Sequence, residues 1–178
     1  MKYIVISYYT KNTPYETEVE RLIESLKRFN IEYDIIGIDN LGDWQKNTMY
    51  KATFILSMIR KYAPRPIVWL DVDAILKDKP IFLDMIDADA AFYYRTDGGR
   101  VPRIPEDCEL ISAAMYFEPN EYTEMLLKMW IEENKKNERD LEQHKLMSSM
   151  DHLWCPLKKM IIIWLREQVW VFHIILFR

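Results

Sequence analysis

Two carboxylates, those of Asp71 and Asp73, directly follow a short run of apolar residues at positions 67–70. The run comes after Pro64 and Pro66 and is rich in β-branched and aromatic residues, which is typical of a buried strand. In an open α/β sheet, ligands bind outside the carboxyl ends of the strands. Two acidic side chains at such an end predict an oxygen-rich site for Mg²⁺ or Mn²⁺, a cation that is usually shared with a phosphate.

The two aspartates also have a purely structural interpretation, because short Asp-x-Asp segments often cap a following turn. An aspartate directly after a fully apolar strand is unfavourable, however, unless it is solvated, paired or bound to a ligand. This setting favours the metal site, and the residues alone leave both interpretations open.

The chain resembles the nucleotide-diphospho-sugar transferases, which are glycosyltransferases of the GT-A fold with an Asp-x-Asp motif. The resemblance rests on the segment IVWLDVDAIL at positions 67–76, on a lysine-bearing helical segment before it and on an apolar strand that begins near Leu110. It covers residues 1–153. It implies a metal-dependent, hexosyltransferase-like enzyme that moves a sugar from a UDP- or GDP-linked donor to an unknown acceptor.

The resemblance also implies roles for the motif itself. Asp71 would reach the nucleotide ribose or a metal-bound water, and Asp73 would ligate the Mn²⁺ or Mg²⁺ that bridges the diphosphate. Val72 lies between them and belongs to the same donor-binding segment.

The composition fits one globular domain of the α/β class. About half of the 178 residues are apolar and 29% are charged, which argues against disorder. The net charge of −4 argues against nucleic acid as the main partner, because that mode of binding needs a basic face. The chain has only two cysteines, Cys108 and Cys155, without metal-site spacing, so we expect a reducing, cytoplasmic compartment.

Apolar periodicity predicts the elements that must position these residues. A strand over residues 3–8 leads through a polar turn into a helix that starts at Pro14, and a second strand covers residues 33–38. This order predicts a right-handed crossover, which places the loops after both strands at the same end of the sheet as the Asp71 loop. A further helix, with Thr48 as its N-cap, precedes the central strand.

The rest of the chain predicts further alternation of helices and strands. The expected elements are a short helix at 80–86, a strand at 88–94, a strand at 110–117 and a helix at 122–133. Residues 95–109, which contain Gly and Pro, form an irregular segment that we interpret as an acceptor-side loop. Residues 132–145 are polar and typical of a solvated helix face. Together these elements predict a GT-A-like (Rossmann-like), mixed and mostly parallel sheet flanked by helices.

A departing diphosphate carries charge that a basic side chain can stabilise, and Lys51 is the best candidate for that side chain. It lies on the helix that precedes the metal strand, where the resembling family places a basic residue facing the diphosphate. The alternative is an ordinary exposed helical lysine. Arg95, Arg100 and Arg103 in the irregular segment are further candidates.

The loop after the first strand is the natural place for the nucleotide. Tyr8, Tyr9 and Thr10 offer an aromatic face with hydroxyl donors for a uracil or guanine base, although aromatic residues there also serve as packing groups. Asp39, at the end of the second strand, is a candidate for the base or ribose and has an equally good role in opening an Asp-Asn turn.

Family members often carry an Asp-Gln pair at the start of a helix, where the acidic residue faces the transferred sugar. The resemblance assigns this role to Asp151, although His152 departs from the pattern and helix capping is the alternative. Because a histidine from the carboxyl-terminal part often completes the metal site in such enzymes, His144, His152 and His173 are candidate third ligands.

No general base is evident, so retention or inversion of the sugar's configuration stays open. The candidates are Glu118, Asp107 and Asp151.

Residues 154–178 turn abruptly to tryptophan and isoleucine and match no family motif. Charged residues interrupt the apolar stretches, which argues against a transmembrane segment. The apolar run at the amino terminus is too short for a secretory signal. One hypothesis is that the tail is an altered or truncated end, with weak turnover as the consequence.

The residues alone are also compatible with two other functions. One is a non-catalytic module that binds a nucleotide-sugar or a metal. The other is a metal-dependent nucleotidyltransferase, which would prefer a Gly-rich loop after the first strand, whereas residues 7–14 contain no glycine.

Overall fold

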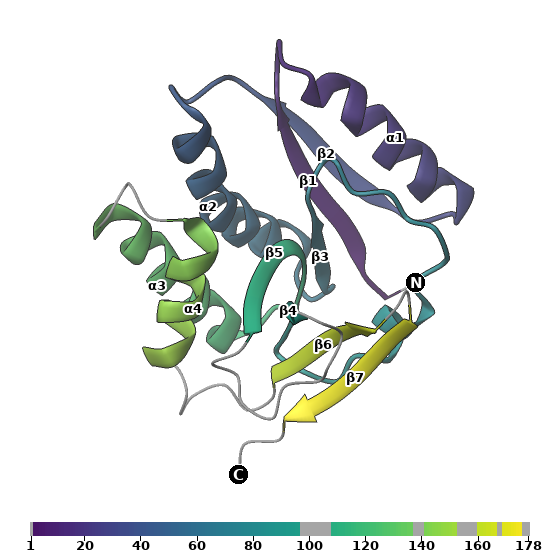
Figure 1. Cartoon of the computed structure of the whole chain (residues 1–178), viewed down its shortest axis with the longest axis vertical. Coiled ribbons are helices and arrows are strands. Elements are labelled where there is room, and N and C mark those ends of the chain that lie inside the picture. Colours follow the sequence, from purple (N-terminus) through teal and green to yellow (C-terminus); the bar gives the residue numbers. More distant parts are fainter. Residues whose placement is uncertain (1, 97–107, 137–140, 153–159, 167–168, 176–178) are drawn as a thin grey trace.

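The structure is a computed structural model that describes residues 2–96, 108–136, 141–152, 160–166 and 169–175 (Figure 1). These residues form one seven-stranded sheet with the strand order β2-β1-β3-β5-β4-β6-β7. The strands are β1 (Ile4–Thr10), β2 (Tyr33–Ile38), β3 (Ile67–Leu70), β4 (Ala90–Thr96), β5 (Cys108–Phe117), β6 (Met160–Arg166) and β7 (Val169–Ile175). The helices are α1 (Tyr15–Arg28), α2 (Trp44–Tyr62), the 3₁₀ helix η1 (Ile81–Met85), α3 (Glu121–Lys136) and α4 (Glu142–His152).

The sheet is mixed, and most of its strands share one direction. β1 pairs in parallel with β2 and β3, and β4 pairs in parallel with β6. β5 runs antiparallel to both β3 and β4, and β7 runs antiparallel to β6. Only β5 and β7 therefore oppose the other five strands, which confirms the predicted mixed, mostly parallel sheet.

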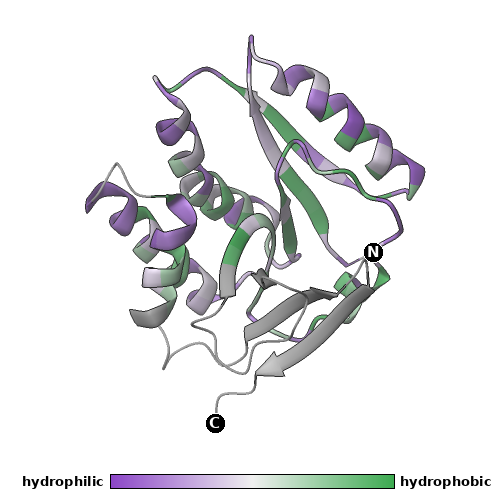
Figure 2. Cartoon of the chain, viewed as in Figure 1, coloured by the Kyte–Doolittle hydropathy of each residue, from purple (hydrophilic) through white to green (hydrophobic). Residues whose placement is uncertain are grey.

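Helices cover both faces of the sheet, with α1 on one side of β1 and α2 on the other (Figure 1). Alternation along β1 explains this arrangement, because Ile4 and Ile6 pack into the α2 side while Tyr3 and Val5 pack into the α1 side. On α1, Leu22 lies one turn before Leu26, and both are buried. The outward face of α1 is hydrophilic (Figure 2).

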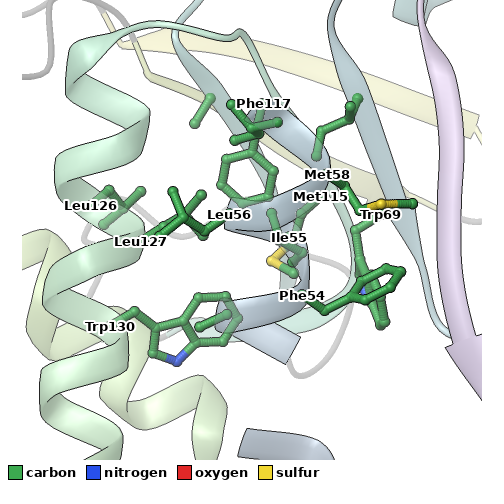
Figure 3. Close-up of a cluster of buried hydrophobic side chains, with 14 of the residues drawn as sticks. Phe54, Ile55, Leu56, Met58, Trp69, Met115, Phe117, Leu126, Leu127 and Trp130 are labelled. Atoms are coloured by element: carbon green, nitrogen blue, oxygen red, sulfur yellow. The ribbon is translucent and has the colours of Figure 1, made fainter. Parts of the chain in front are cut away.

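The larger core lies between the sheet and helices α2, α3 and α4. Leu56 of α2 lies beside Leu127 of α3 in this cluster, whereas Phe54 points to the other side of α2, toward Trp69 of β3 (Figure 3). Each fully buried side chain of this size contributes roughly 1.5–3 kcal/mol. This packing fixes α2 against β3, and α2 carries Lys51.

Helix α2 begins four residues earlier than the predicted cap. Thr48 is not its N-cap, because the Thr48 hydroxyl donates to the carbonyl of Gln45 inside the helix, 2.9 Å away. The cap is Asp43, whose carboxylate accepts a hydrogen bond from the backbone N–H of Lys46 at 2.8 Å.

The strands on either side of the irregular segment also differ from the expectation. β4 is shifted by two residues, to Ala90–Thr96, and β5 starts two residues earlier than predicted, at Cys108. Residues 97–107 lie outside the described part of the chain. In the tail, the backbone of β6 and β7 extends the same sheet beside β4. Among the described helices, none combines the length and the apolar character needed to cross a bilayer.

Replacing Asp43 by alanine tests the cap of α2. We expect the free energy of unfolding in urea to fall by about 1 kcal/mol, because one N–H of the first turn loses its acceptor. The control is Asp78→Ala, which removes an exposed carboxylate and should change stability by less than about 0.5 kcal/mol. Equal stability of the two variants would contradict the assignment of the cap.

Candidate functional site

A pocket of about 280 Å³ opens at the carboxyl ends of β1 and β3. The start of β5 and the first turn of α4 close its other side. Most of the residues predicted for the donor site line it: Tyr8, Tyr9, Thr10, Lys51, Asp71, Val72 and Asp73. Further lining residues that the sequence did not single out include Ser112, Glu142 and Gln143.

The turn after β3 sets the backbone of the two aspartates. The N–H of Asp71 donates to the carbonyl of Ala113 at 2.8 Å, the last contact between β3 and β5, and the carbonyl of Asp71 accepts from Ala74 at 3.0 Å. This turn buries Val72 and exposes Asp73. Both carboxylates thus lie at the end of a buried strand and line the pocket.

The two carboxylates have different surroundings. Oδ1 of Asp71 accepts a hydrogen bond from the indole Nε1 of Trp69 at 2.8 Å and lies 3.0 Å from Nζ of Lys51. The side chain of Asp71 keeps 32% of its surface exposed. Within the described residues, no side chain or backbone group bonds to the carboxylate of Asp73.

Lys51 is buried, so its interpretation as an ordinary exposed lysine is wrong. Its Nζ lies 2.9 Å from Oε1 of Glu142, 3.0 Å from Asp71 and 3.1 Å from the hydroxyl of Ser112. The ammonium also lies 5.3 Å from the centre of the Trp69 ring. A lysine ammonium that is buried away from water needs such partners, because an unpaired buried charge is strongly unfavourable.

Opposing effects set the pKa of Lys51. Burial lowers it, and the charges of Asp71 and Glu142 raise it by more, so the pKa lies above its ordinary value of 10.5. The stabilisation from this ammonium is therefore fully present below pH 10.5 and is lost only as the pH rises through the raised value. At neutral pH the pocket holds a permanent cation beside its carboxylates.

Glu142 is the main functional candidate that the sequence reasoning missed. Its side chain is only 10% exposed, and its Oε1 accepts from both Lys51 and the Ser112 hydroxyl, the latter at 2.5 Å. Its Oε2 is buried and has no hydrogen-bond partner among the described residues. The prediction that residues 132–145 form a solvated face is therefore wrong at Glu142, and also at Lys145, which is buried.

The predicted helix start at Asp151 is also wrong. Helix α4 opens at Glu142 and contains Asp151 and His152 as its last residues. The side chains of Asp151 and His152 lie outside the described part of the structure. An acidic residue followed by glutamine at a helix start is instead found at Glu142 and Gln143, both of which line the pocket. That dipeptide was the available signal, concealed within a polar run.

The tyrosines after β1 are held by packing. The ring of Tyr8 lies 5.2 Å from the rings of Phe54 and Trp69, and its hydroxyl donates to the carbonyl of Asn47 at 2.5 Å. Burial, followed by the charges of Asp71 and Glu142, raises the pKa of the Tyr8 hydroxyl, so this donor stays protonated. Its role toward a nucleotide base remains a prediction.

Tyr9 points to the opposite face of β1 and lies against β2. A Cβ added at Gly37 would come within 2.8 Å of the far end of the Tyr9 ring, so a larger residue at position 37 would displace this ring. Thr10 is buried, and its carbonyl accepts from the Thr13 hydroxyl at 2.6 Å. Tyr15, the first residue of α1, also lines the pocket. The β1 loop therefore offers two partly exposed rings, Tyr9 and Tyr15, beside the carboxylates.

Two predicted residues lie away from the pocket. Asp39 is at the expected end of the sheet, but its side chain is 90% exposed, pairs with Lys11 at 3.1 Å and does not line the pocket. Glu118 follows β5, which runs antiparallel to β3, so it lies at the opposite end of the sheet and is not placed to act as the base. There Glu118 accepts a hydrogen bond from the hydroxyl of Tyr116.

The remaining candidates are only partly described. His144 is exposed on α4 and is not among the residues that line the pocket. Arg95 and His173 belong to β4 and β7, and their side chains lie outside the described part. Residues 100, 103 and 107, the other arginine and aspartate candidates, also lie outside it.

The donor set of the pocket fits a hard divalent cation bound together with a phosphate. Asp71 and Asp73 supply carboxylate oxygens, and Mg²⁺ typically takes one or two carboxylates while keeping water and phosphate as other ligands. Within the described residues, no group of three or more His, Cys, Asp or Glu side chains could hold a metal ion.

Comparison with known proteins identifies the architecture. No family model and no curated protein sequence matches the chain. Among solved structures, it is similar to a glycosyltransferase involved in glycosylation of the major capsid of PBCV-1, with a TM-score of 0.66 and 14% identity over 93% of this chain and 82% of that one. This chain has a glycosyltransferase fold, of the GT-A-like type.

Two further structures support this fold. The glycosyltransferase GlyE of Streptococcus pneumoniae, in its apo form, aligns with a TM-score of 0.56 and 14% identity over 87% of this chain and 44% of GlyE. The galactosyltransferase LgtC, in complex with donor and acceptor sugar analogues, aligns with a TM-score of 0.53 and 11% identity over 83% of this chain and 70% of LgtC. At such identities the likeness is one of fold.

Substitution of Lys51 by methionine tests the buried charge cluster. We expect a loss of about 3 kcal/mol in the free energy of unfolding at pH 7, because Glu142 and Asp71 lose their counter-charge. Adding Glu142→Gln should restore at least about 1 kcal/mol, since it removes the stranded charge. The control is Lys61→Met on the same helix, which removes the exposed partner of Asp34 and should change the free energy of unfolding far less, because exposed ion pairs contribute little. A similar small loss in both lysine variants would disprove the cluster's importance.

Proposed function

We propose that this protein is a metal-dependent glycosyltransferase that transfers a sugar from a nucleotide-diphosphate donor to an acceptor. The observation that carries the proposal is the position of Asp71 and Asp73 at the end of β3, in a pocket with one buried cation, on a glycosyltransferase fold. In open α/β sheets this end of the strands is where ligands bind.

Different residues of the pocket would bind different parts of the donor. The nucleotide would lie over the loop after β1, where Tyr9, Thr10 and Tyr15 border the pocket. Oxygens of Asp71 and Asp73 would hold Mn²⁺ or Mg²⁺ on the diphosphate. When bound, the cation supplies charge stabilisation for the departing diphosphate. Lys51 contributes a fixed positive charge behind Asp71, so the carboxylates do not repel the phosphates at full strength.

Glu142 and Gln143 are the proposed contacts to the transferred sugar. Oε2 of Glu142 is a buried acceptor without a partner at the wall of the pocket. A buried acceptor of this kind is unfavourable unless a ligand supplies a donor, and a sugar hydroxyl is a suitable donor. Its other oxygen, Oε1, is already engaged by Lys51 and Ser112, which fixes the direction of Oε2.

Thermal shift measurements test donor binding. We expect UDP or GDP with Mn²⁺ to raise Tm by about 5–10 °C at a hundredfold excess over Kd, since the ligand binds only the folded chain. The shift should disappear in Asp73→Asn, which removes a metal-binding charge, and persist in Asp78→Asn, an exposed residue outside the pocket. Equal shifts in both variants would disprove the role of Asp73.

Turnover separates an enzyme from a binding module. We expect release of nucleoside diphosphate from a nucleotide-sugar in the presence of Mn²⁺, with a rate that falls at least about 100-fold in Asp73→Asn. The assay is a coupled measurement of UDP or GDP formation over a panel of UDP- and GDP-sugars. Mn²⁺-dependent binding without any turnover across the panel would favour the non-catalytic module.

A further inference from the structure

The two carboxylate oxygens of Asp71 are not equivalent. Both protein donors, the indole N–H of Trp69 and the ammonium of Lys51, meet the same oxygen, Oδ1, at 2.8 and 3.0 Å. Within the described part of the chain, Oδ2 accepts no hydrogen bond. Since Asp71 lines the pocket and is 32% exposed, the oxygen left for a ligand is Oδ2.

Trp69 is held rigidly enough to orient this carboxylate. Its side chain is 2% exposed and lies within 5.2 Å of the Tyr8 ring and 6.0 Å of the Phe54 ring, measured between centroids. The ammonium of Lys51 lies 5.3 Å from the same indole ring. One buried ring therefore contacts both members of the Lys51–Asp71 pair.

We propose that Trp69 is a positioning residue for the cation site: its indole N–H and the Lys51 ammonium hold Oδ1 of Asp71, so that Oδ2 faces the pocket and binds a divalent cation carried by a nucleoside diphosphate. This inference rests on the proposed function. Trp69 does not touch the cation and acts only through Asp71.

The indole N–H fixes the orientation of the Asp71 carboxylate, which Lys51 alone does not do. The terminal torsion of aspartate has broad minima, so a carboxylate with one flexible lysine partner can rotate and offer both oxygens to the ammonium. In that arrangement Lys51 would compete with a metal ion for Asp71. The indole donor comes from a residue two positions earlier on the same chain segment and fixes one oxygen, which leaves the other available.

The inference also distinguishes the two aspartates. Asp73 is exposed and can adjust to the ligand, whereas Asp71 is fixed by its neighbours before any ligand arrives. A site with one fixed oxygen loses less conformational entropy on binding than a site with two mobile carboxylates. The orienting partners of metal ligands commonly account for a 10- to 100-fold difference in metal affinity.

The test is Trp69→Phe, which keeps an aromatic ring in the core, removes the N–H donor and makes the ring smaller. Mn²⁺ binding is measured by the loss of the free Mn²⁺ EPR signal, with UDP or GDP present, and nucleotide binding without metal is measured by calorimetry. We expect the Kd for Mn²⁺ to rise about 10-fold, with metal-free nucleotide affinity unchanged within about twofold.

The matched control is Tyr62→Phe. It also removes a single donor to a carboxylate, the hydroxyl that reaches Asp34 at 2.6 Å, but Tyr62 lies outside the pocket. This variant should bind Mn²⁺ like the wild type. An equal Kd for Mn²⁺ in Trp69→Phe and Tyr62→Phe would overturn the inference, as would a parallel loss of metal-free nucleotide binding, which would indicate general damage to the pocket.

Failure of the proposed function gives a different pattern. If the wild type itself binds no Mn²⁺ with either nucleotide, both the metal site and the role of Trp69 are wrong. If the wild type binds Mn²⁺ and Trp69→Phe binds it equally well, only the role of Trp69 is wrong. A separate readout is the indole N–H resonance of Trp69, which should move upfield in Asp71→Asn as the charge-assisted hydrogen bond weakens.

Discussion

The buried ammonium of Lys51 is the constraint on which the site depends. It lies on α2, its two counter-charges come from the end of β3 and the start of α4, and the hydroxyl of Ser112 on β5 completes its contacts. Removing a lysine from water is unfavourable unless such partners are present, so α4 is held against the carboxyl end of β3 by charge as well as by apolar packing. The cluster joins the two halves of the pocket wall, and any shift of α4 would leave buried charges unpaired.

The same cluster gives the pocket its chemical character. Among the described residues that line the pocket, the carboxylates of Asp71, Asp73 and Glu142 outnumber the ammonium of Lys51, so this lining carries an excess of negative charge. An excess of negative charge favours the binding of a cation. The proposed function therefore couples a metal ion to the nucleotide. Glu142 occupies an intermediate position in this scheme, since one of its oxygens stabilises Lys51 and the other is buried without a partner at the pocket wall.

The fold persists at low sequence identity because it requires a pattern of apolar positions and not particular residues. Alternating apolar residues on β1 and β3 serve both faces of the sheet, and a small number of helical residues at spacings of three and four cover them. At 14% identity the PBCV-1 capsid glycosyltransferase has the same architecture over 93% of this chain. A shared fold does not specify the donor or the acceptor. Those depend on the side chains that line the pocket.

Local pattern predicted strands β1 to β5, helices α1 to α3 and the position of Asp71 and Asp73, because apolar periodicity and a carboxylate after a buried strand are features of adjacent residues. It did not predict α4, β6 or β7. Only the tertiary structure decided the partners of these residues. Glu142 meets Lys51 across 91 positions of sequence, and the Glu-Gln dipeptide that marks it lies within a polar run whose burial the local pattern does not predict. Because β5 runs antiparallel to β3, Glu118 at the end of β5 lies at the opposite end of the sheet from the pocket. The direction of β5 is set by its pairing with β3 and cannot be read from the residues of β5 alone. Long-range pairing decides which polar groups lose their water, and the chemistry of the site follows from that loss.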